Sequence, residues 1–209
     1  MLQSKTRWLL KKADETIINT LMNELNQPRI VAALLVNRGI KTVDAARSFL
    51  YAAEQDFYDP FLLSGMEEAV KRIVKAVKND EKITIYGDYD ADGVSSTTVL
   101  KLALNQLGAE QVDWYIPNRF TEGYGPNKDA FRKIKEMGTS LLITVDCGIS
   151  AIEEAQLAKE LGMDYIVTDH HEPGPVLPEA LAILHPKKPG ETYPFSDLAG
   201  AGVAMKLAH

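Results

Sequence analysis

The spacing of apolar positions divides the chain into a helical first part and a longer second part with mixed elements. Between residues 14 and 26, apolar residues recur at the three- and four-residue spacing of a helix. Pro28 is suited to open a second helix that Gly39 ends, and a third helix is expected over residues 43–50. Residues 51–61 show no clear period, so we interpret this segment as a linker.

After the linker, short β-rich runs alternate with helical segments. Ser64 with Glu67, and Ser150 with Glu153, have the spacing of capping boxes at helix starts. This alternation predicts an α/β fold with a mainly parallel sheet and helices on both faces. We therefore predict a helical N-terminal extension with its linker over residues 1–60 and an α/β domain over residues 61–209. The expected strands are 83–86, 112–116, 141–145, 165–168 and 181–184, and the expected helices are 64–79, 95–107, 126–137 and 150–162.

Several polar or aromatic side chains are interpreted as structural. Trp114 falls within an expected strand and is predicted to lie in the core. His185 follows the last expected strand and is predicted to lie in a surface loop. The helix over residues 64–79 is predicted to have a solvated basic face, formed by Lys71, Arg72, Lys75 and Lys78.

Composition narrows the class of protein. The chain has 209 residues, of which 45% are hydrophobic, and 23 basic against 29 acidic residues give a net charge of −6. No window approaches the 18 consecutive apolar residues of a transmembrane helix, and the first seven residues do not resemble a signal peptide. The single cysteine, Cys147, excludes a disulfide framework and fits a reducing compartment. We therefore expect a cytoplasmic protein that does not bind a membrane.

Chemically distinctive segments follow four of the expected strands directly. In an open parallel sheet, ligands bind beyond the carboxyl ends of the strands. Three of these ends are followed by carboxylates, and the other is followed by Arg119. The segments are GDYDADG at 87–93, PNRFTEGYG at 117–125, DCG at 146–148 and DHHE at 169–172.

So many acidic groups at one edge would repel one another unless a cation lay among them. Oxygen and imidazole ligands without thiolates suit Mn²⁺ or Mg²⁺, and Zn²⁺ also fits by ligand type alone. The number of ligands indicates two ions, and a pair about 3.5–4 Å apart is the usual device for phosphodiester hydrolysis. The net negative charge argues against nonspecific binding of nucleic acid, although bound cations would offset part of it.

Each segment alone has a less specific interpretation. An Asp-x-Asp-x-Asp-Gly run resembles the start of a calcium loop, but the glutamate expected six residues later is replaced by Val99. A solvated turn, a helix cap or a surface histidine pair would explain the separate segments. A haloacid-dehalogenase phosphatase also has Asp-x-Asp after a strand, but it lacks an Asp-His-His motif. The occurrence of all segments at successive strand ends favours a metal site.

In this order, DYDADG at 88–93, VDCG at 145–148 and DHH at 169–171 resemble the first three motifs of the DHH phosphoesterase superfamily. Within it, IPNR at 116–119 and EGYG at 122–125 resemble the RecJ-type single-strand-specific DNA exonucleases. TRW at 6–8 and LAGAGVA at 198–204 show the same likeness. The resemblance extends over nearly the whole chain.

The resemblance implies a Mn²⁺- or Mg²⁺-dependent nuclease that hydrolyses single-stranded DNA from the 5′ end in DNA repair and recombination. Partners such as a single-strand-binding protein or a helicase are expected for the full-length enzyme. The implied metal ligands are Asp90, Asp92, Asp146, His170 and His171, and the catalytic set adds Asp88 and Asp169 as residues that orient ligands. The expected substrate-binding residues are Arg119, for a phosphate, and Gly123, Gly125, Gly200 and Gly202, although the last two could equally serve helix packing.

The resemblance also predicts a fourth metal motif beyond Gly202, and the sequence stops at His209. We therefore expect this chain to be the N-terminal metal-binding half of a longer enzyme, with incomplete activity by itself. Other members of the superfamily stay open as alternatives: a nano-RNase, a cyclic-dinucleotide phosphodiesterase or a manganese pyrophosphatase. A non-catalytic nucleic-acid-binding relative is a further alternative.

Overall fold

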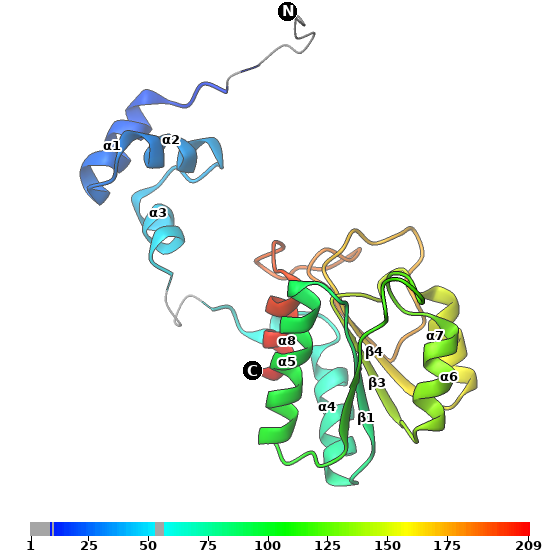
Figure 1. Cartoon of the computed structure of the whole chain (residues 1–209). Coiled ribbons are helices and arrows are strands. Elements are labelled where there is room, and N and C mark those ends of the chain that lie inside the picture. Colours follow the sequence, from blue (N-terminus) through cyan, green and yellow to red (C-terminus); the bar gives the residue numbers. More distant parts are fainter. Residues whose placement is uncertain (1–8, 10, 53–56) are drawn as a thin grey trace, which may run out of the picture. The chain divides into compact units, whose positions relative to one another are not determined.

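The computed structural model describes residue 9, residues 11–52 and residues 57–209 (Figure 1). The contacts within the chain divide it into two compact units, one on each side of the Phe57–Tyr58 bond. Among the described residues, no helix is long and apolar enough to cross a membrane.

The described residues of the first unit form three short helices, α1 (Glu15–Leu25), α2 (Arg29–Asn37) and α3 (Val43–Leu50). The carboxylate of Asp14 caps α1 by accepting the backbone N–H of Thr16. Buried aliphatic residues from all three helices share one small core: Ile18, Leu21, Leu25, Ala32, Leu35, Val36 and Ala46. The helical periodicity of the sequence predicted these elements.

The second unit is built on a five-stranded sheet in which every neighbouring pair is parallel. The strand order is β2-β1-β3-β4-β5, and Ile83 of β1 is in register with Val112 of β2 and Leu141 of β3. The predicted α/β fold with a parallel sheet is therefore confirmed. The strands are β1 (Ile83–Tyr86), β2 (Val112–Tyr115), β3 (Leu141–Val145), β4 (Asp164–Thr168) and β5 (Ala182–Leu184).

Helices cover both faces of the sheet. On one face, α4 (Met66–Lys78), α5 (Ala91–Gln106) and α8 (Gly200–Ala208) share a core with Ile83 and Ile85. On the other face, α6 (Lys128–Glu136) and α7 (Ile152–Glu160) pack with Tyr86 and Leu142. Figure 1 shows α5 and α8 side by side and α6 with α7 on the opposite side of the strands. A one-turn 3-10 helix, η2 (Pro60–Leu62), precedes α4.

The strand order creates a switch point between β1 and β3. After β1 the chain crosses to β2 on one side, and β3 then lies on the other side of β1. The loops that leave β1 and β3 therefore diverge, and the crevice between them is where open α/β sheets bind ligands.

Three predictions about local structure are wrong. Neither expected capping box forms, because α4 starts after Gly65 (φ +88°) and α7 starts after Ala151, both without a side-chain cap. The hydroxyl of Ser64 donates instead to Glu191 at 2.5 Å. The helix expected from residue 95 begins earlier, at Ala91.

Two side chains also lie in environments that the sequence did not predict. Trp114 is 54% exposed because β2 is an edge strand, and the Lys101 ammonium lies 3.4 Å from its ring centroid. Arg72 is buried rather than solvated, and its guanidinium forms ion pairs with Glu81 and Asp164.

Candidate metal centre

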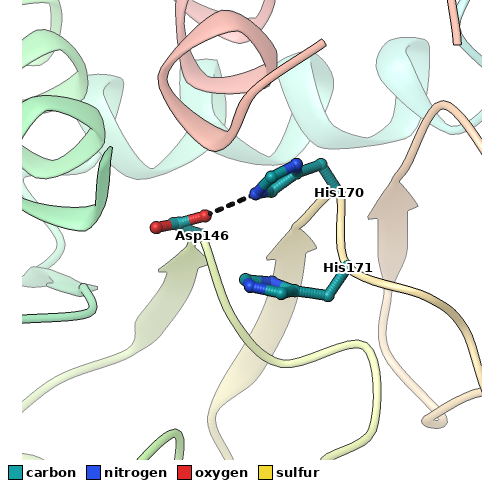
Figure 2. A group of neighbouring side chains, drawn as sticks. All are labelled: Asp146, His170 and His171. Carbon is teal, nitrogen blue, oxygen red and sulfur yellow. Dashed lines mark ion pairs between the residues drawn. The ribbon is translucent and has the colours of Figure 1, made fainter. Parts of the chain in front are cut away.

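Acidic and histidine residues meet where β1, β3 and β4 end. Asp146 directly follows β3, and its backbone N–H donates to the carbonyl of Thr168, the last residue of β4. His170 and His171 leave the neighbouring strand end, so all three side chains point into the same space (Figure 2). The strand register therefore brings together residues that lie about 25 positions apart in the sequence.

Two groups of side chains in this space have the arrangement of a metal site. Asp146, His170 and His171 each offer one ligand atom, and these atoms lie within 4.8 Å of one another. His170 Nε2 lies 3.1 Å from Asp146 Oδ1, the contact drawn dashed in Figure 2. Asp88, Asp90 and Asp146 form the second group by the same criterion. Asp146 belongs to both groups and therefore lies where two ions could share it.

Asp146 is the residue whose environment most requires a cation. It is 1% exposed, and within the part of the chain that the structure describes neither carboxylate oxygen accepts a hydrogen bond of regular geometry, although Oδ1 lies 3.1 Å from His170 Nε2. Burial, and then the negative charge of Asp92, raise the pKa of Asp146 to about 7. Its backbone has φ +59°, an uncommon conformation for a non-glycine residue that tends to occur at functional sites. A bound divalent cation would satisfy these oxygens, so the residues present fit a metal.

Asp169 orients His171. Its Oδ1 lies 2.7 Å from His171 Nδ1 and also accepts the backbone N–H of His170, while Oδ2 accepts the N–H of Ile149. Burial by itself would lower the pKa of His171, but the hydrogen bond and charge of Asp169 raise it overall. Because Nδ1 is engaged, Nε2 is the atom left for a ligand, and it lies 3.2 Å from the hydroxyl of Tyr124.

The carboxylates of Asp90 and Asp92 accept backbone N–H groups at the start of helices. Asp90 caps α5 by accepting the N–H groups of Asp92 and Gly93. The carboxylate of Asp92 accepts the N–H groups of Gly200 and Ala201 at 2.8 and 2.7 Å, and so caps α8 from a different helix. Its Oδ2 lies 3.4 Å from His170 Nε2, although among the described residues neither ligand group includes Asp92.

Asp88 lies against Gly93 in the first turn of α5 and is almost fully buried. One of its oxygens accepts the backbone N–H of Tyr89 at 2.7 Å. Burial raises the pKa of the Asp88 carboxyl, and the charges of His171 and Arg119 act in the opposite direction. Asp88 is therefore a second buried acid at the same edge as Asp146.

The late glycines make close contacts inside the chain. A Cβ on Gly200 would lie 2.3 Å from Asp146 Oδ1, so glycine at this position leaves room for that carboxylate. A Cβ on Gly202 would lie 3.2 Å from the Leu198 side chain. Both glycines therefore serve packing in this structure, and their contact with a substrate stays a prediction.

Arg119 lies in the loop after β2, on the same edge of the sheet. It is exposed, and its guanidinium carbon lies 5.1 Å from the ring centroid of Tyr89. Gly123 and Gly125 in this loop have positive φ values of 83° and 77°, and the carbonyl of Gly125 accepts the Tyr86 hydroxyl. The geometry leaves the guanidinium accessible to a ligand, and its role in binding phosphate stays a prediction.

Comparison with known proteins agrees with this geometry. The model of the DHH family, N-terminal domain, matches residues 82–209. The chain belongs to the DHH family. The single-stranded-DNA-specific exonuclease RecJ of Bacillus subtilis (strain 168) is 59% identical over 209 residues. The resemblance to RecJ exonucleases that the sequence indicated is therefore confirmed.

Solved structures of RecJ have the same fold. A RecJ structure described as bound to manganese aligns with a TM-score of 0.64 at 38% identity, over 70% of this chain and 37% of that one. RecJ from Thermus thermophilus in complex with Mn²⁺ aligns with a TM-score of 0.68 at 30% identity, over 95% of this chain and 27% of that one. The match to the Bacillus relative covers 100% of this chain but 26% of the relative, so the chain spans about a quarter of its length.

Two residues beside the candidate metal centre were not predicted as functional. His185 is fully buried next to His171, although the sequence favoured a surface loop. The sequence could have indicated this role, because His185 directly follows β5 and the other residues of the site also follow strand ends. Tyr124 was quoted within a motif, but its contact with His171 depends on loop geometry. Cys147 is buried and burial raises its pKa, which agrees with a structural role.

Proposed function

We propose that this chain is the metal-binding half of a single-strand-specific DNA exonuclease that works from the 5′ end in DNA repair and recombination. The observation that carries the proposal is the buried Asp146 carboxylate, which accepts no hydrogen bond of regular geometry from the described residues and is shared by two ligand groups. The names of the RecJ relatives support the substrate, and their manganese complexes support the metal.

The proposed ligands of two Mn²⁺ or Mg²⁺ ions are Asp90, Asp92, Asp146, His170 and His171. When bound, such a pair polarises phosphoryl oxygens and offsets the charge of the leaving oxygen. For Asp92, metal binding competes with helix capping, since both of its oxygens already accept backbone N–H groups of α8. We therefore expect α8 to be coupled to metal binding through Asp92.

The other residues of the site bind or orient. Asp169 holds His171 through Nδ1, so that Nε2 stays directed to the centre. Asp88 adds a second buried carboxylate beside Asp90. Arg119 is proposed to hold a substrate phosphate, because its planar guanidinium suits bidentate contact, with Gly123 and Gly125 allowing the DNA backbone to approach. Gly200 and Gly202 are likewise proposed to line the site where the DNA backbone binds.

The remaining predictions extend this function. Residues 1–60 are proposed to form a helical extension with its linker, and residues 61–209 the DHH-type domain. Protein partners are proposed to be a single-strand-binding protein or a helicase, and the compartment is proposed to be the cytoplasm. Neither partner nor compartment affects the test of the centre itself.

The first experiment measures metal binding by the 209-residue chain. Isothermal titration with Mn²⁺ should show saturable binding that Asp146→Asn weakens by at least about a hundredfold and that Asp129→Asn, an exposed change on α6, leaves unchanged. Equal binding by all three proteins would place the metal elsewhere.

The second experiment measures activity. The chain is expressed with any sequence that its gene encodes after His209, and assayed with Mn²⁺ on single strands labelled at the 5′ or the 3′ end. Duplex DNA, dinucleotides and pyrophosphate are the competing substrates. We expect mononucleotide release from 5′ ends of single strands. Preferred hydrolysis of dinucleotides or pyrophosphate would contradict the proposed substrate and support another DHH-type activity.

A further inference from the structure

His185 lies at the end of β5, next to the strand that carries the two histidines of the centre. β4 and β5 pair up to Thr168 and Leu184, and the N–H of Asp169 still donates to the Leu184 carbonyl. His185 directly follows β5, and its side chain is fully buried. A polar ring in this position needs partners, because burying an unpaired donor or acceptor is costly.

Both ring nitrogens of His185 have such partners, and the partners define its tautomer. Nδ1 accepts the backbone N–H of Lys187 at 3.0 Å, so it carries no proton. The proton therefore lies on Nε2, which donates to the backbone carbonyl of His171 at 2.7 Å. The neutral ring joins the two strand ends where the ladder of backbone hydrogen bonds stops.

The loop that carries His185 is fastened to the rest of the unit. The Lys188 ammonium donates to the carbonyl of Ser64 at 2.7 Å and to the carbonyl of Ile183. It also lies 3.3 Å from the carboxylate of Glu191, whose side chain is 2% exposed. His185 is therefore a fixed donor.

His171 depends on a fixed donor because it lies where regular structure ends. Its side chain is 44% exposed, and the chain after it forms an irregular segment before β5. Asp169 orients the ring through Nδ1, but a ring hydrogen bond does not fix the position of the backbone. The contact from His185 fixes the peptide group to which the His171 side chain is attached.

We propose that His185 is a positioning residue for the metal centre, which holds the backbone of His171 so that the His171 ring stays in the ligand group with Asp146 and His170. This inference rests on the proposed function, since the readout is metal binding. Partners that orient ligands are typically worth a 10- to 100-fold change in metal affinity. The backbone contact acts less directly, so we expect the lower end of this range.

The test compares His185→Gln with His185→Leu in the 209-residue chain. Glutamine can place an N–H donor where His185 has Nε2, whereas leucine fills similar space without a donor. Titration with Mn²⁺ should show an affinity within about twofold of wild type for the glutamine variant and a loss of roughly tenfold for the leucine variant. If the leucine variant does not fold, His185→Asn replaces it, because asparagine can accept from Lys187 but is too short to reach His171.

Nuclear magnetic resonance of the metal-free chain gives a readout independent of Mn²⁺. The ring nitrogens of His185 should show the proton on Nε2, and the imidazole signals of His171 should move in the leucine or asparagine variant but not in the glutamine variant. A proton on Nδ1, unchanged His171 signals in the variants without the donor, or wild-type Mn²⁺ affinity in those variants would each overturn the inference. Absence of Mn²⁺ binding by the wild-type chain would instead contradict the proposed function, and the His171 signals would still decide the role of His185.

Discussion

Buried charges have oppositely charged partners at one end of the parallel sheet, whereas acids gather at the other end. At the amino ends of the strands, Arg72 of α4 forms ion pairs with Glu81 before β1 and with Asp164 at the start of β4. At the carboxyl ends, Asp88 and Asp146 are buried beside Asp90 and Asp92. The pKa of Glu81 is lowered, since the hydrogen bonds and charge of Arg72 outweigh its burial, whereas the pKa of Asp146 is raised to about 7.

This difference distinguishes buried charges that stabilise the fold from buried charges that are available to bind a ligand. A carboxylate whose cation comes from the chain needs nothing further, and removing that cation destabilises the protein. A buried carboxylate without such a cation costs free energy in the empty protein and recovers it when a metal binds. Strong pKa perturbation at one edge and not at the other is therefore a signal of function.

The largest expected effect comes from removing the charge of Asp146. Asparagine has nearly the same shape and tolerates a positive φ, so Asp146→Asn keeps the backbone while it removes a ligand. We expect Mn²⁺ affinity to fall by at least about a hundredfold, and the increase in melting temperature with Mn²⁺ to disappear. Titration calorimetry and thermal melts with and without Mn²⁺ measure both.

Asp164→Asn makes the same chemical change at the amino edge and is the matched control. It should leave Mn²⁺ affinity at the wild-type value while lowering the stability of the chain. Similar Mn²⁺ affinities for the two variants would show that the carboxyl edge is not the metal site.

The next effect is a loss of stability without a loss of metal binding. Arg72→Met keeps the apolar stem of the side chain but leaves Glu81 and Asp164 without their cation. We expect about 2 kcal/mol lower free energy of unfolding, less than for a fully buried pair because the Asp164 side chain is 48% exposed. Urea denaturation measures this loss. A variant as stable as wild type would contradict the view that the ion pairs of Arg72 at the amino edge stabilise the fold.

The smallest effect, taken per pH unit, is the pH dependence of the metal-free chain. A raised pKa means that folded Asp146 binds a proton more tightly than the unfolded chain does. Stability should therefore fall as the pH rises from about 4 to about 7, by at most about 1.4 kcal/mol per pH unit. The raised pKa of Asp88 acts in the same direction.

Urea titrations at several pH values, with chelator or with saturating Mn²⁺, test this sign. Mn²⁺ should reverse the slope, because the cation binds the deprotonated carboxylates. Asp146→Asn should reduce the slope in chelator. A metal-free chain that gains stability between pH 5 and pH 7 would contradict the raised pKa.

Much of the candidate site could be predicted because it follows a rule of topology. Parallel strands end at one edge, so motifs that follow β1, β3 and β4 meet there whatever the details of packing. The association of Asp146 with His170 needed only this rule and the order of the motifs. The capping boxes failed because side-chain spacing cannot show that Ser64 has a stronger partner in Glu191, 127 positions away.

The sequence alone determined the parallel α/β fold, the strand ends that carry chemistry and the family of the chain, because periodicity and motif order are local properties. Only the tertiary structure decided which acids lack a permanent cation, since Arg72 reaches Asp164 across 92 positions, whereas among the described residues the ion-pair contact of Asp146 is with His170 and not with a lysine or arginine. It also decided that Asp92 caps α8, that Gly200 gives room to Asp146 and that His185 holds His171. These contacts join distant segments, and packing sets them rather than spacing.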